Sequence, residues 1–316
     1  MNITMEQAAE KLMAANKLLI TAHVNPDGDA VGSVLGLSAF LRGKGKKVTA
    51  MIDDKLPRNL SFLPGYDAIL RPEEGKKADA ELLVILDTSL DRIGEVAKAA
   101  EGLPVLNIDH HISNDGKADF LYNDNRAAAA EMIFEIIDHL GGDFPPEVAT
   151  PLYTGLATDT GFFKFSNTRP DTLRAAARLL EAGVRPEQVS EALEEKPESI
   201  VRGQAAALQT MELSYGGRVA GLYLDKELAA SLETTEGFID FVCVIEGVEI
   251  AVLIKCMDEN FCRVSVRSKG IDVSKVAMKF GGGGHIRAAG FPVKKPLAEA
   301  KKDVLDALAE VLGEKA

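Results

Sequence analysis

Four short apolar runs recur in the first third of the chain, and each is followed closely by polar, titratable side chains. The runs span residues 18–22, 48–52, 82–86 and 105–108. Short runs of this kind are typical of parallel strands buried on both faces. The side chains that follow them are His23, Asp27, Asp53, Asp87, Asp109, His110 and His111. Because open α/β sheets bind ligands beyond the carboxyl ends of their strands, we predict an α/β fold with a functional site at that edge.

The length of the chain favours two domains, because 316 residues exceed the usual size of one. We place a parallel-sheet domain at residues 1–184, a polar helical linker at 185–209 and a smaller, mixed α/β domain at 210–316. Helices are expected at 4–16, 127–140, 145–158 and 170–182, the first opened by a capping box of Thr4 and Gln7. The second domain is expected to hold strands 218–224, 249–257 and 261–267, with a hairpin turn at 258–260, and helices 272–279 and 296–312.

The charge of the chain argues against long nucleic acids as partners. The 36 Lys and Arg residues against 48 Asp and Glu residues give a net charge of −12, which repels a polyphosphate backbone. A short single-stranded oligonucleotide or a nucleotide could still bind through a local basic cluster. We therefore expect substrates of limited length and no long duplex.

The three cysteines, Cys243, Cys256 and Cys262, form no C-x-x-C pair. An odd number without that spacing suggests reduced thiols and a cytoplasmic protein. The N-terminus lacks a basic segment followed by an apolar run, and no stretch reaches the roughly 18 apolar residues of a membrane span. We expect no targeting signal and no membrane association.

The segment from His23 to Asp29 contains Pro26 and Gly28, which favour a sharp turn. Such a turn can direct His23, Asp27 and Asp29 into one small volume. An equally weighted alternative is that Asp27 and Asp29 only cap the following helix. Asp87 has a similar alternative, as the N-cap of the segment after its strand.

The triplet Asp109-His110-His111 is difficult to explain as packing, because three adjacent titratable residues are costly to bury without partners. Asp159 considered alone is more simply a turn residue. It becomes a candidate ligand only together with the other His and Asp residues named above. Imidazole and carboxylate ligands without cysteine suit Mn²⁺, Mg²⁺ or Fe²⁺. So many anionic ligands repel one another unless more than one cation is present. We therefore predict two divalent metal ions, Mn²⁺ being preferred, and the hydrolysis of phosphoesters.

Arg263, Ser265 and Arg267 alternate with apolar residues, which predicts a strand with one basic face. At about 3.3 Å per residue the two arginines lie about 13 Å apart, a length that suits a dinucleotide. The glycines at 281–284 could present backbone N–H groups to an anion, and His285 could add a side-chain donor. Solvated arginines on an edge strand and a glycine hinge are the alternative interpretations.

Taken together, these motifs closely resemble the DHH phosphoesterase superfamily. The resemblance covers both domains and is carried by the segments at 23–29, 86–88, 108–111, 158–161 and 281–290. Within the superfamily the chain looks most like the nanoRNase and pAp phosphatase group. The resemblance implies a metal-dependent phosphoesterase that acts on short oligonucleotides, linear dinucleotides and 3′-phosphoadenosine 5′-phosphate. It also implies a DHH domain, a DHH-associated domain and an active site in the cleft between them.

The resemblance further implies individual roles. One metal would be held by His23, Asp27 and Asp87. The other would be held by Asp29, Asp87, His110 and Asp159, so that Asp87 bridges the two. His111 and Asp109 would be catalytic, His111 facing the scissile phosphate and Asp109 supporting the triplet. The nucleotide would be bound by Arg263, Arg267, Ser268, Gly282, Gly283 and His285.

Two positions depart from the pattern that the resemblance implies. Asp53 matches no ligand position, so we expect a structural or peripheral role. The run of alanines at 127–130 stands where relatives often carry Ser or Thr, which leaves contacts from this segment open.

Other functions remain open. A manganese-dependent inorganic pyrophosphatase shares the metal motifs, but the glycine-histidine segment at 281–285 disfavours it. A cyclic-dinucleotide phosphodiesterase and a nucleotide sensor without turnover are further alternatives. The oligomeric state, including a homodimer, is also open.

Overall fold

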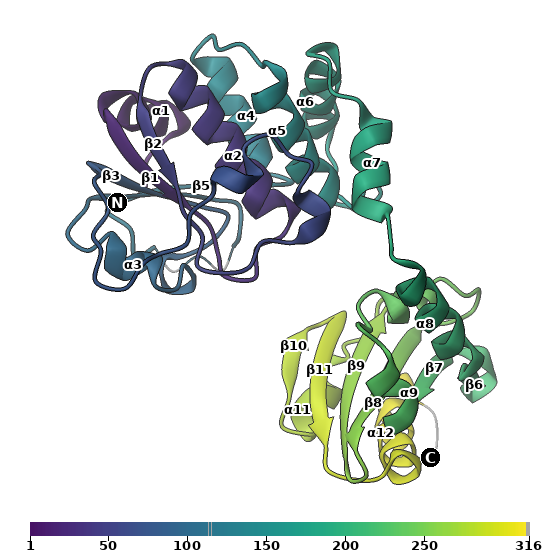
Figure 1. Ribbon diagram of the computed structural model, residues 1–316. Coiled ribbons are helices and arrows are strands. Elements are labelled where there is room, and N and C mark those ends of the chain that lie inside the picture. The colour runs from purple at the N-terminus through teal and green to yellow at the C-terminus, as the bar shows by residue number, and fades with distance from the viewer. Residues whose placement is uncertain (113, 115, 314–316) are drawn as a thin grey trace. The chain divides into compact units, whose positions relative to one another are not determined.

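The structure is a computed structural model that describes residues 1–112, 114 and 116–313. The chain forms two compact units, Met1–Glu195 and Lys196–Ala316. Figure 1 shows the elements of both units. Each unit has a sheet and a hydrophobic core of its own.

The first unit is built on a five-stranded parallel sheet in the order β2-β1-β3-β4-β5. Its strands are β1 (Lys17–Thr21), β2 (Lys47–Ala50), β3 (Leu82–Leu86), β4 (Val105–Asp109) and β5 (Phe120–Asn123). Its α-helices are α1 (Met5–Ala14), α2 (Gly28–Gly43), α3 (Val96–Ala99), α4 (Ala129–His139), α5 (Pro146–Asp159), α6 (Pro170–Glu181) and α7 (Pro186–Glu194). Short 3₁₀ turns occur at η1 (Arg58–Leu60), η2 (Tyr66–Ala68) and η3 (Leu90–Arg92). The predicted α/β class and parallel sheet are confirmed.

The two faces of this sheet are covered unequally because successive strand residues point to opposite sides. Leu18 and Ile20 of β1 pack into the large core with buried residues of α1, α2, α4 and α5. Leu19 points the other way, into a smaller cluster with Val96 of α3. Figure 1 shows α3 on the opposite side of the sheet from α2, α4 and α5. Both faces of the sheet are therefore buried, which explains the continuous apolar runs.

Helix boundaries follow local chemistry. The expected capping box is present, because Thr4 accepts the N–H of Gln7 and the Gln7 side chain accepts the N–H of Thr4. Helix α1 ends at Ala14, two residues earlier than expected. Helix α4 starts at Ala129 because the backbone of Ala128 is extended. The predicted linker region contains α7 and part of the second unit, α8 (Glu198–Gln209).

The second unit contains a six-stranded mixed sheet in the order β10-β11-β9-β8-β7-β6, in which only the β7–β8 pair is parallel. Its strands are β6 (Glu212–Ser214), β7 (Val219–Leu224), β8 (Ile250–Asp258), β9 (Phe261–Ser268), β10 (Gly283–His285) and β11 (Ala288–Val293). The remaining helices are α9 (Lys226–Ser231), α10 (Phe238–Cys243), α11 (Ser274–Lys279) and α12 (Leu297–Leu312), with a 3₁₀ turn at η4 (Tyr215–Gly217). The predicted mixed α/β character is confirmed.

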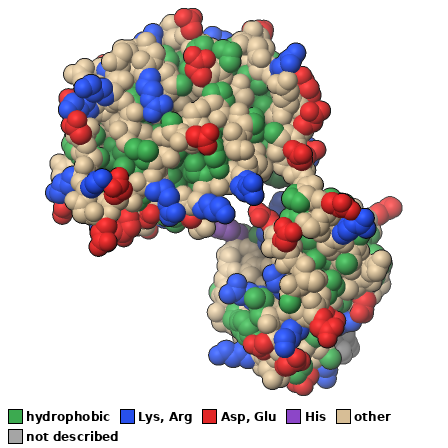
Figure 2. All heavy atoms as spheres, viewed as in Figure 1, with side chains coloured by type: hydrophobic (Ala, Val, Ile, Leu, Met, Phe, Trp, Pro, Cys, Tyr) green, Lys and Arg blue, Asp and Glu red, His purple; other side chains and the backbone are tan. Residues whose placement is uncertain are grey.

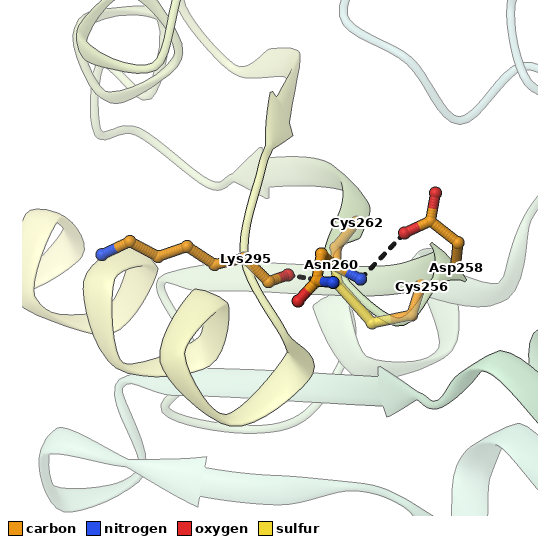
Figure 3. Close-up of a disulfide and its surroundings, with 5 residues drawn as sticks. All are labelled: Cys256, Asp258, Asn260, Cys262 and Lys295. Carbon is orange, nitrogen blue, oxygen red and sulfur yellow. Dashed lines mark hydrogen bonds between the residues drawn. A yellow bond between two sulfur atoms is a disulfide. The ribbon is translucent and has the colours of Figure 1, made fainter.

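The expectation that all three thiols are reduced is wrong, because Cys256 and Cys262 form a disulfide. The antiparallel register of β8 and β9 places them directly opposite each other, with Cα atoms 4.0 Å apart. Figure 3 shows the bridge beside the hairpin turn, where the N–H of Asn260 donates to Asp258. Only Cys243 is free. The predicted hairpin turn at 258–260 already places Cys256 and Cys262 on neighbouring antiparallel strands, and this pairing could have been inferred from it.

The visible surface carries mixed charge. Figure 2 shows acidic and basic side chains interspersed over the face in view. Within the described residues, no helix combines the length and the apolar character needed to cross a bilayer.

Candidate active site

The predicted ligand residues of the first unit meet at the carboxyl ends of β1, β3 and β4. Three groups of side chains place their ligand atoms within 4.8 Å of one another. The groups are His23, Asp27 and Asp87; Asp29, His110 and Asp159; and Asp87, His110 and His111. Asp87 and His110 each belong to two groups, so the three sets form one continuous cluster.

The loop after β1 positions His23 and Asp27 together. Asn25 has a left-handed backbone with φ of 55°, which turns the chain sharply between them. One carboxylate oxygen of Asp27 caps α2 by accepting the N–H groups of Asp29 and Ala30. Its other oxygen lies 3.9 Å from His23 Nε2. Asp27 is therefore the N-cap of α2, as the alternative interpretation expected. Its second carboxylate oxygen remains available as a metal ligand.

Asp87 lies at the centre of the cluster and is almost fully buried. Its carboxylate is 3.1 Å from His110 Nε2 and 3.5 Å from His23 Nε2. Burial raises the pKa of Asp87, but the hydrogen bonds from the two imidazoles outweigh burial and lower the pKa below its usual value. The backbone of Asp87 is left-handed, with φ of 59°, a strained conformation for a residue with a side chain. The turn directs its side chain to the histidines, and Asp87 does not cap the next segment.

His110 is oriented by its second ring nitrogen. Nδ1 lies 3.2 Å from the carbonyl oxygen of Arg126, and Nε2 points toward Asp87, Asp159 and Asp29. Burial lowers the pKa of His110, yet the hydrogen bond to Asp87 and the nearby carboxylates raise it overall to about 10. His23 shows the same arrangement, with Nδ1 2.9 Å from the carbonyl oxygen of Val24. Both imidazoles thus present Nε2 to the acidic cluster.

Asp29 does not cap its own helix but meets the start of α4. Its two carboxylate oxygens accept the N–H groups of Ala129 and Ala130. Burial raises the pKa of Asp29 well above its ordinary value, and the charges of Asp87 and Asp159 raise it further. Gly155 is required nearby, because a Cβ there would lie 2.8 Å from Asp29 Oδ1.

Asp159 is the last residue of α5 and lies 3.6 Å from His110 Nε2. Burial raises the pKa of Asp159 to about 6, although His110 opposes the increase. Among the described residues, the basic groups within ion-pair distance of Asp27, Asp29, Asp87 and Asp159 are all histidines. The cluster therefore gathers more negative charge than its neighbouring side chains neutralise.

Asp109 supports the triplet through hydrogen bonds. Its Oδ1 atom lies 2.8 Å from His111 Nδ1 and also accepts the N–H of His111. Its Oδ2 atom accepts a hydrogen bond from Asn114 at 2.6 Å. The hydrogen bond to Asp109 is the main reason that the pKa of His111 is raised.

Sequence reasoning missed two residues that complete this network. The buried Asn107 accepts a hydrogen bond from Asn114 and donates to the carbonyl oxygens of Ile85 and Thr88. Asn107 ties β4 to β3, and Asn114 extends this link to Asp109. The sequence did contain an indication of this role. Asn107 is a polar residue inside the apolar run 105–108, and a buried amide needs hydrogen-bond partners.

The alanine run at 127–130 contributes through its backbone. Ala129 and Ala130 donate to Asp29, while the N–H of Ala127 donates to the buried Glu131. Side-chain hydroxyls are thus not needed for these contacts. Asp53 accepts the N–H of Glu95, which fits the structural role expected for it.

In the second unit, the alternating pattern of β9 is confirmed. Arg263 is exposed and Arg267 half-buried on one face, whereas Cys262, Val264 and Val266 are buried on the other. Ser268 is buried, and its hydroxyl donates to the carbonyl oxygen of Ile271. His285 is exposed on the edge strand β10.

The glycines at 281–284 were expected to present several backbone N–H groups to an anion, and the first two of these amides already have partners within the protein. The N–H of Gly281 donates to Met278 and that of Gly282 donates to Ala277, so both complete the end of α11. Gly282 also permits close packing, because a Cβ there would lie 2.3 Å from the carbonyl oxygen of Gly290. These two N–H groups are used at the end of α11, and the sequence pattern did not show where this helix ends.

Comparison with known proteins identifies the family. The DHH family, N-terminal domain, matches residues 17–156, and the DHHA1 domain matches residues 216–314. A Thermus thermophilus protein named bifunctional oligoribonuclease and PAP phosphatase NrnA is 36% identical over 98% of this chain and 94% of that protein. The chain belongs to the DHH family.

Two further proteins are similar to most of this chain. A Bacillus subtilis protein with the same name is 28% identical over 86% of this chain and 88% of its own length. The crystal structure of an exopolyphosphatase-related protein from Bacteroides fragilis superposes with a TM-score of 0.87 at 26% identity, covering 97% and 95% of the two chains. The similarity to these DHH proteins extends over both units.

Proposed function

We propose that this DHH family protein is a phosphoric ester hydrolase acting on short oligoribonucleotides and on 3′-phosphoadenosine 5′-phosphate. The names of the relatives from T. thermophilus and B. subtilis support both activities. The observation that carries the proposal is the shared position of Asp87 between His23 and His110. One buried carboxylate between two imidazoles is the arrangement that a bridging ligand requires.

The residues present fit divalent cations. In both His23 and His110, Nδ1 is held by a backbone carbonyl oxygen and Nε2 points to carboxylates. Metal-binding histidines usually donate their other ring N–H in this way, because the contact fixes the tautomer and the ring orientation. A surplus of carboxylate charge over neighbouring cations supports the same conclusion.

We infer that one cation is held by His23, Asp27 and Asp87, and the other by Asp29, Asp87, His110 and Asp159. Held by these residues, two cations would supply positive charge for the attacking and leaving oxygens of an in-line displacement at phosphorus. The imidazole and carboxylate donors suit Mn²⁺, which we propose ahead of Mg²⁺ or Fe²⁺.

His111 and Asp109 act on the phosphate side of the site in this proposal. Asp109 holds His111 Nδ1, which leaves the opposite ring nitrogen available to donate a hydrogen bond to a phosphate oxygen. In the metal-free protein, the hydrogen bond to Asp109 raises the pKa of His111, which favours a protonated imidazole. A positive charge placed there opposes the negative charge that develops during hydrolysis.

The second unit is proposed to bind the nucleotide. Arg263 and Arg267 lie on one face of β9, and Ala288 of β11 pairs with both Arg267 and His285. We assign residues 1–184 to catalysis, 185–209 to a linker and 210–316 to substrate binding. Ser268, Gly282 and Gly283 shape this region, since the Ser268 hydroxyl and the Gly282 amide already have partners.

The deciding experiment compares turnover of five substrates by the Mn²⁺-loaded protein. We expect an RNA dinucleotide and 3′-phosphoadenosine 5′-phosphate to be hydrolysed well, and a long RNA, a cyclic dinucleotide and pyrophosphate to be hydrolysed poorly. A chelator should abolish turnover, and Mn²⁺ should restore it better than Ca²⁺. Pyrophosphate as the best substrate, or full turnover after metal removal, would contradict the proposal.

A further inference from the structure

A cavity of about 480 Å³ lies beside the edge strand β2, outside the ligand cluster. Its lining includes Asp54, Lys55, Arg58, Tyr66, Asp67 and Arg71. We call it the basic pocket, because three cations face two carboxylates within it. Its volume falls in the range of sites that bind small molecules.

Among the described residues, the three cations of the basic pocket form no close ion pair, although Arg71 lies near enough to Asp54 to lower its pKa. Within the described part of the chain, Lys55, Arg58 and Arg71 form none of the ion pairs that most other basic residues of this unit form. The larger cavity of about 900 Å³ on the same unit is different. There each lysine has a glutamate partner, in the pairs Lys76–Glu73, Lys77–Glu101 and Lys98–Glu95. Unpaired cations thus distinguish the basic pocket from this larger cavity.

One of the two carboxylates is already committed to the backbone. Asp54 accepts the N–H of Asn25 with Oδ2 and the N–H of Lys55 with Oδ1. These amides lower the pKa of Asp54, and Arg71 lowers it further. Asp67 is the remaining acid and is exposed. Both carboxylates stay negative, so three cations against two carboxylates leave the basic pocket with a net charge of one positive for an anionic ligand to meet.

The pocket adjoins the ligand cluster through Asp54. Its Oδ2 atom lies 2.8 Å from the nitrogen of Asn25, which stands between His23 and Asp27 in sequence. The same carboxylate thus lines the basic pocket and holds the turn that positions both ligand residues. The basic pocket is therefore linked through Asp54 to the loop that carries His23 and Asp27.

The walls of the basic pocket are braced by hydrogen bonds. The hydroxyl of Tyr66 lies 3.1 Å from the carbonyl oxygens of both Leu56 and Pro57, which joins η2 to the segment after β2. The N–H of Ile52 donates to Leu70, so Arg71 is held beside this segment. The half-buried ring of Tyr66 adds an apolar surface to the charged one.

We propose that the basic pocket binds a nucleoside phosphate, with the phosphate held by Arg58, Arg71 and Lys55. This proposal rests on the proposed function, since it adds a second phosphate site next to the reaction centre. The phosphate could belong to the far end of an oligonucleotide whose scissile bond lies at the ligand cluster. It could also belong to a separate mononucleotide, such as the AMP that hydrolysis releases.

The test uses the full-length, Mn²⁺-loaded protein and the variant Arg58→Gln/Arg71→Gln. If the pocket holds the far end of the substrate, the KM of a tetranucleotide should rise about tenfold to a hundredfold while that of a dinucleotide is unchanged. If the pocket holds a separate nucleotide, AMP should inhibit dinucleotide hydrolysis with a noncompetitive component that the variant lacks. Either result supports the pocket and identifies the source of the phosphate.

Two further variants control for charge and geometry. Lys44→Gln/Lys47→Gln removes the same charge near the opposite end of β2 and should change neither measurement. Arg58→Lys/Arg71→Lys retains the charge and should behave largely like the parent. Calorimetric titration with AMP reports binding without turnover, whereas dinucleotide hydrolysis by the parent tests the proposed function separately. Unchanged tetranucleotide KM, AMP inhibition and AMP affinity in the Gln variant would overturn the inference.

Discussion

Asp29 accepts the backbone N–H of Ala129 at 2.6 Å, joining two helix starts that are 100 residues apart in sequence. Its second oxygen accepts the N–H of Ala130 at 2.9 Å. Helix α4 has no side-chain cap of its own, so Asp29 satisfies the N–H groups that open it. A residue of the ligand cluster thereby also stabilises the fold around it.

We expect Asp29→Ala to destabilise the protein even when metal is absent. The substitution leaves two buried N–H groups without an acceptor, at a cost of about 1–3 kcal/mol each, which is partly offset because the repulsion of Asp29 by Asp87 and Asp159 is removed. Urea unfolding in the presence of a chelator measures this cost apart from metal binding. Ser33→Ala is the matched control, because Ser33 only donates to Asp29 and its loss leaves the α4 amides satisfied. Equal stability of Asp29→Ala and the parent would show that α4 does not depend on this cap.

Asp87→Ala should lower turnover of a dinucleotide on the order of 10³-fold or more, because it removes the carboxylate shared by both proposed cations. Asp53→Ala is the matched control, since Asp53 also follows a strand of the sheet but hydrogen-bonds to Glu95. That variant should retain most of the activity. Steady-state kinetics with metal analysis distinguishes the two, and a similar loss in both would refute the assignment of Asp87.

Asn114→Ala should reduce kcat about 10- to 100-fold while leaving metal content unchanged. Asn114 holds Asp109, which in turn orients His111, so its loss releases the imidazole rather than a ligand. Asn123→Ala provides a control, because the Asn123 side chain donates to the backbone carbonyl oxygen of His111 and not to the Asp109 side chain. A drop in bound metal for Asn114→Ala would instead place this residue in metal binding.

The stability of the metal-free protein should depend on pH through Asp159. Its folded-state pKa of about 6 lies above the unfolded value of about 3.9, so folding takes up a proton between these values. The contribution of Asp159 is favourable at low pH and is lost as the pH rises through about 6. Between pH 5 and 7 the parent should lose on the order of 1 kcal/mol relative to Asp159→Asn. Urea titrations in the presence of a chelator measure the free energy of unfolding of both proteins at each pH. If this free energy depends on pH in the same way for the parent and for Asp159→Asn, the pKa of Asp159 is not raised.

Arg267→Ala should raise the KM of a dinucleotide while the proposed cations stay bound. Loss of one charge-assisted contact is worth roughly 1.5–3 kcal/mol, so kcat/KM should fall about tenfold to more than a hundredfold. A small generic phosphodiester, which lacks a second nucleoside, should be hydrolysed almost as before. If both substrates are affected equally, the second unit does not bind the nucleotide as proposed.

The sequence was sufficient to predict the parallel sheet and the residues that gather at its edge. Buried parallel strands are apolar on both faces, so Leu82–Leu86 is recognisable without any tertiary information. Residues such as Asp87 and His110 directly follow those runs, and strand order alone brings them close. Their positions are therefore a consequence of local pattern and topology.

Other features depend on contacts between distant segments. Strand β11 contains Gly290 and Pro292, which disfavour a strand locally, yet it pairs along its length with β9. The partners of the Gly281 and Gly282 amides are set by where α11 ends. The Asp54–Asn25 bond joins loops whose separation in sequence carries no periodic signal. Such contacts follow from packing, which residue patterns do not describe.

At residue 87 the backbone and the side chain favour different amino acids. The left-handed backbone favours Gly, whereas the site needs the carboxylate of Asp. Gly tolerates φ of 59° better than Asp does, so Gly relieves local strain at this position, whereas Asn gains little because Asn and Asp visit the left-handed region alike. Both would remove the charged carboxylate between His23 and His110. Because the hydrogen bonds from both imidazoles stabilise that carboxylate in the folded protein, relief of backbone strain at residue 87 is opposed by the loss of these contacts, and a substitution there that raises heat resistance must also be tested for activity.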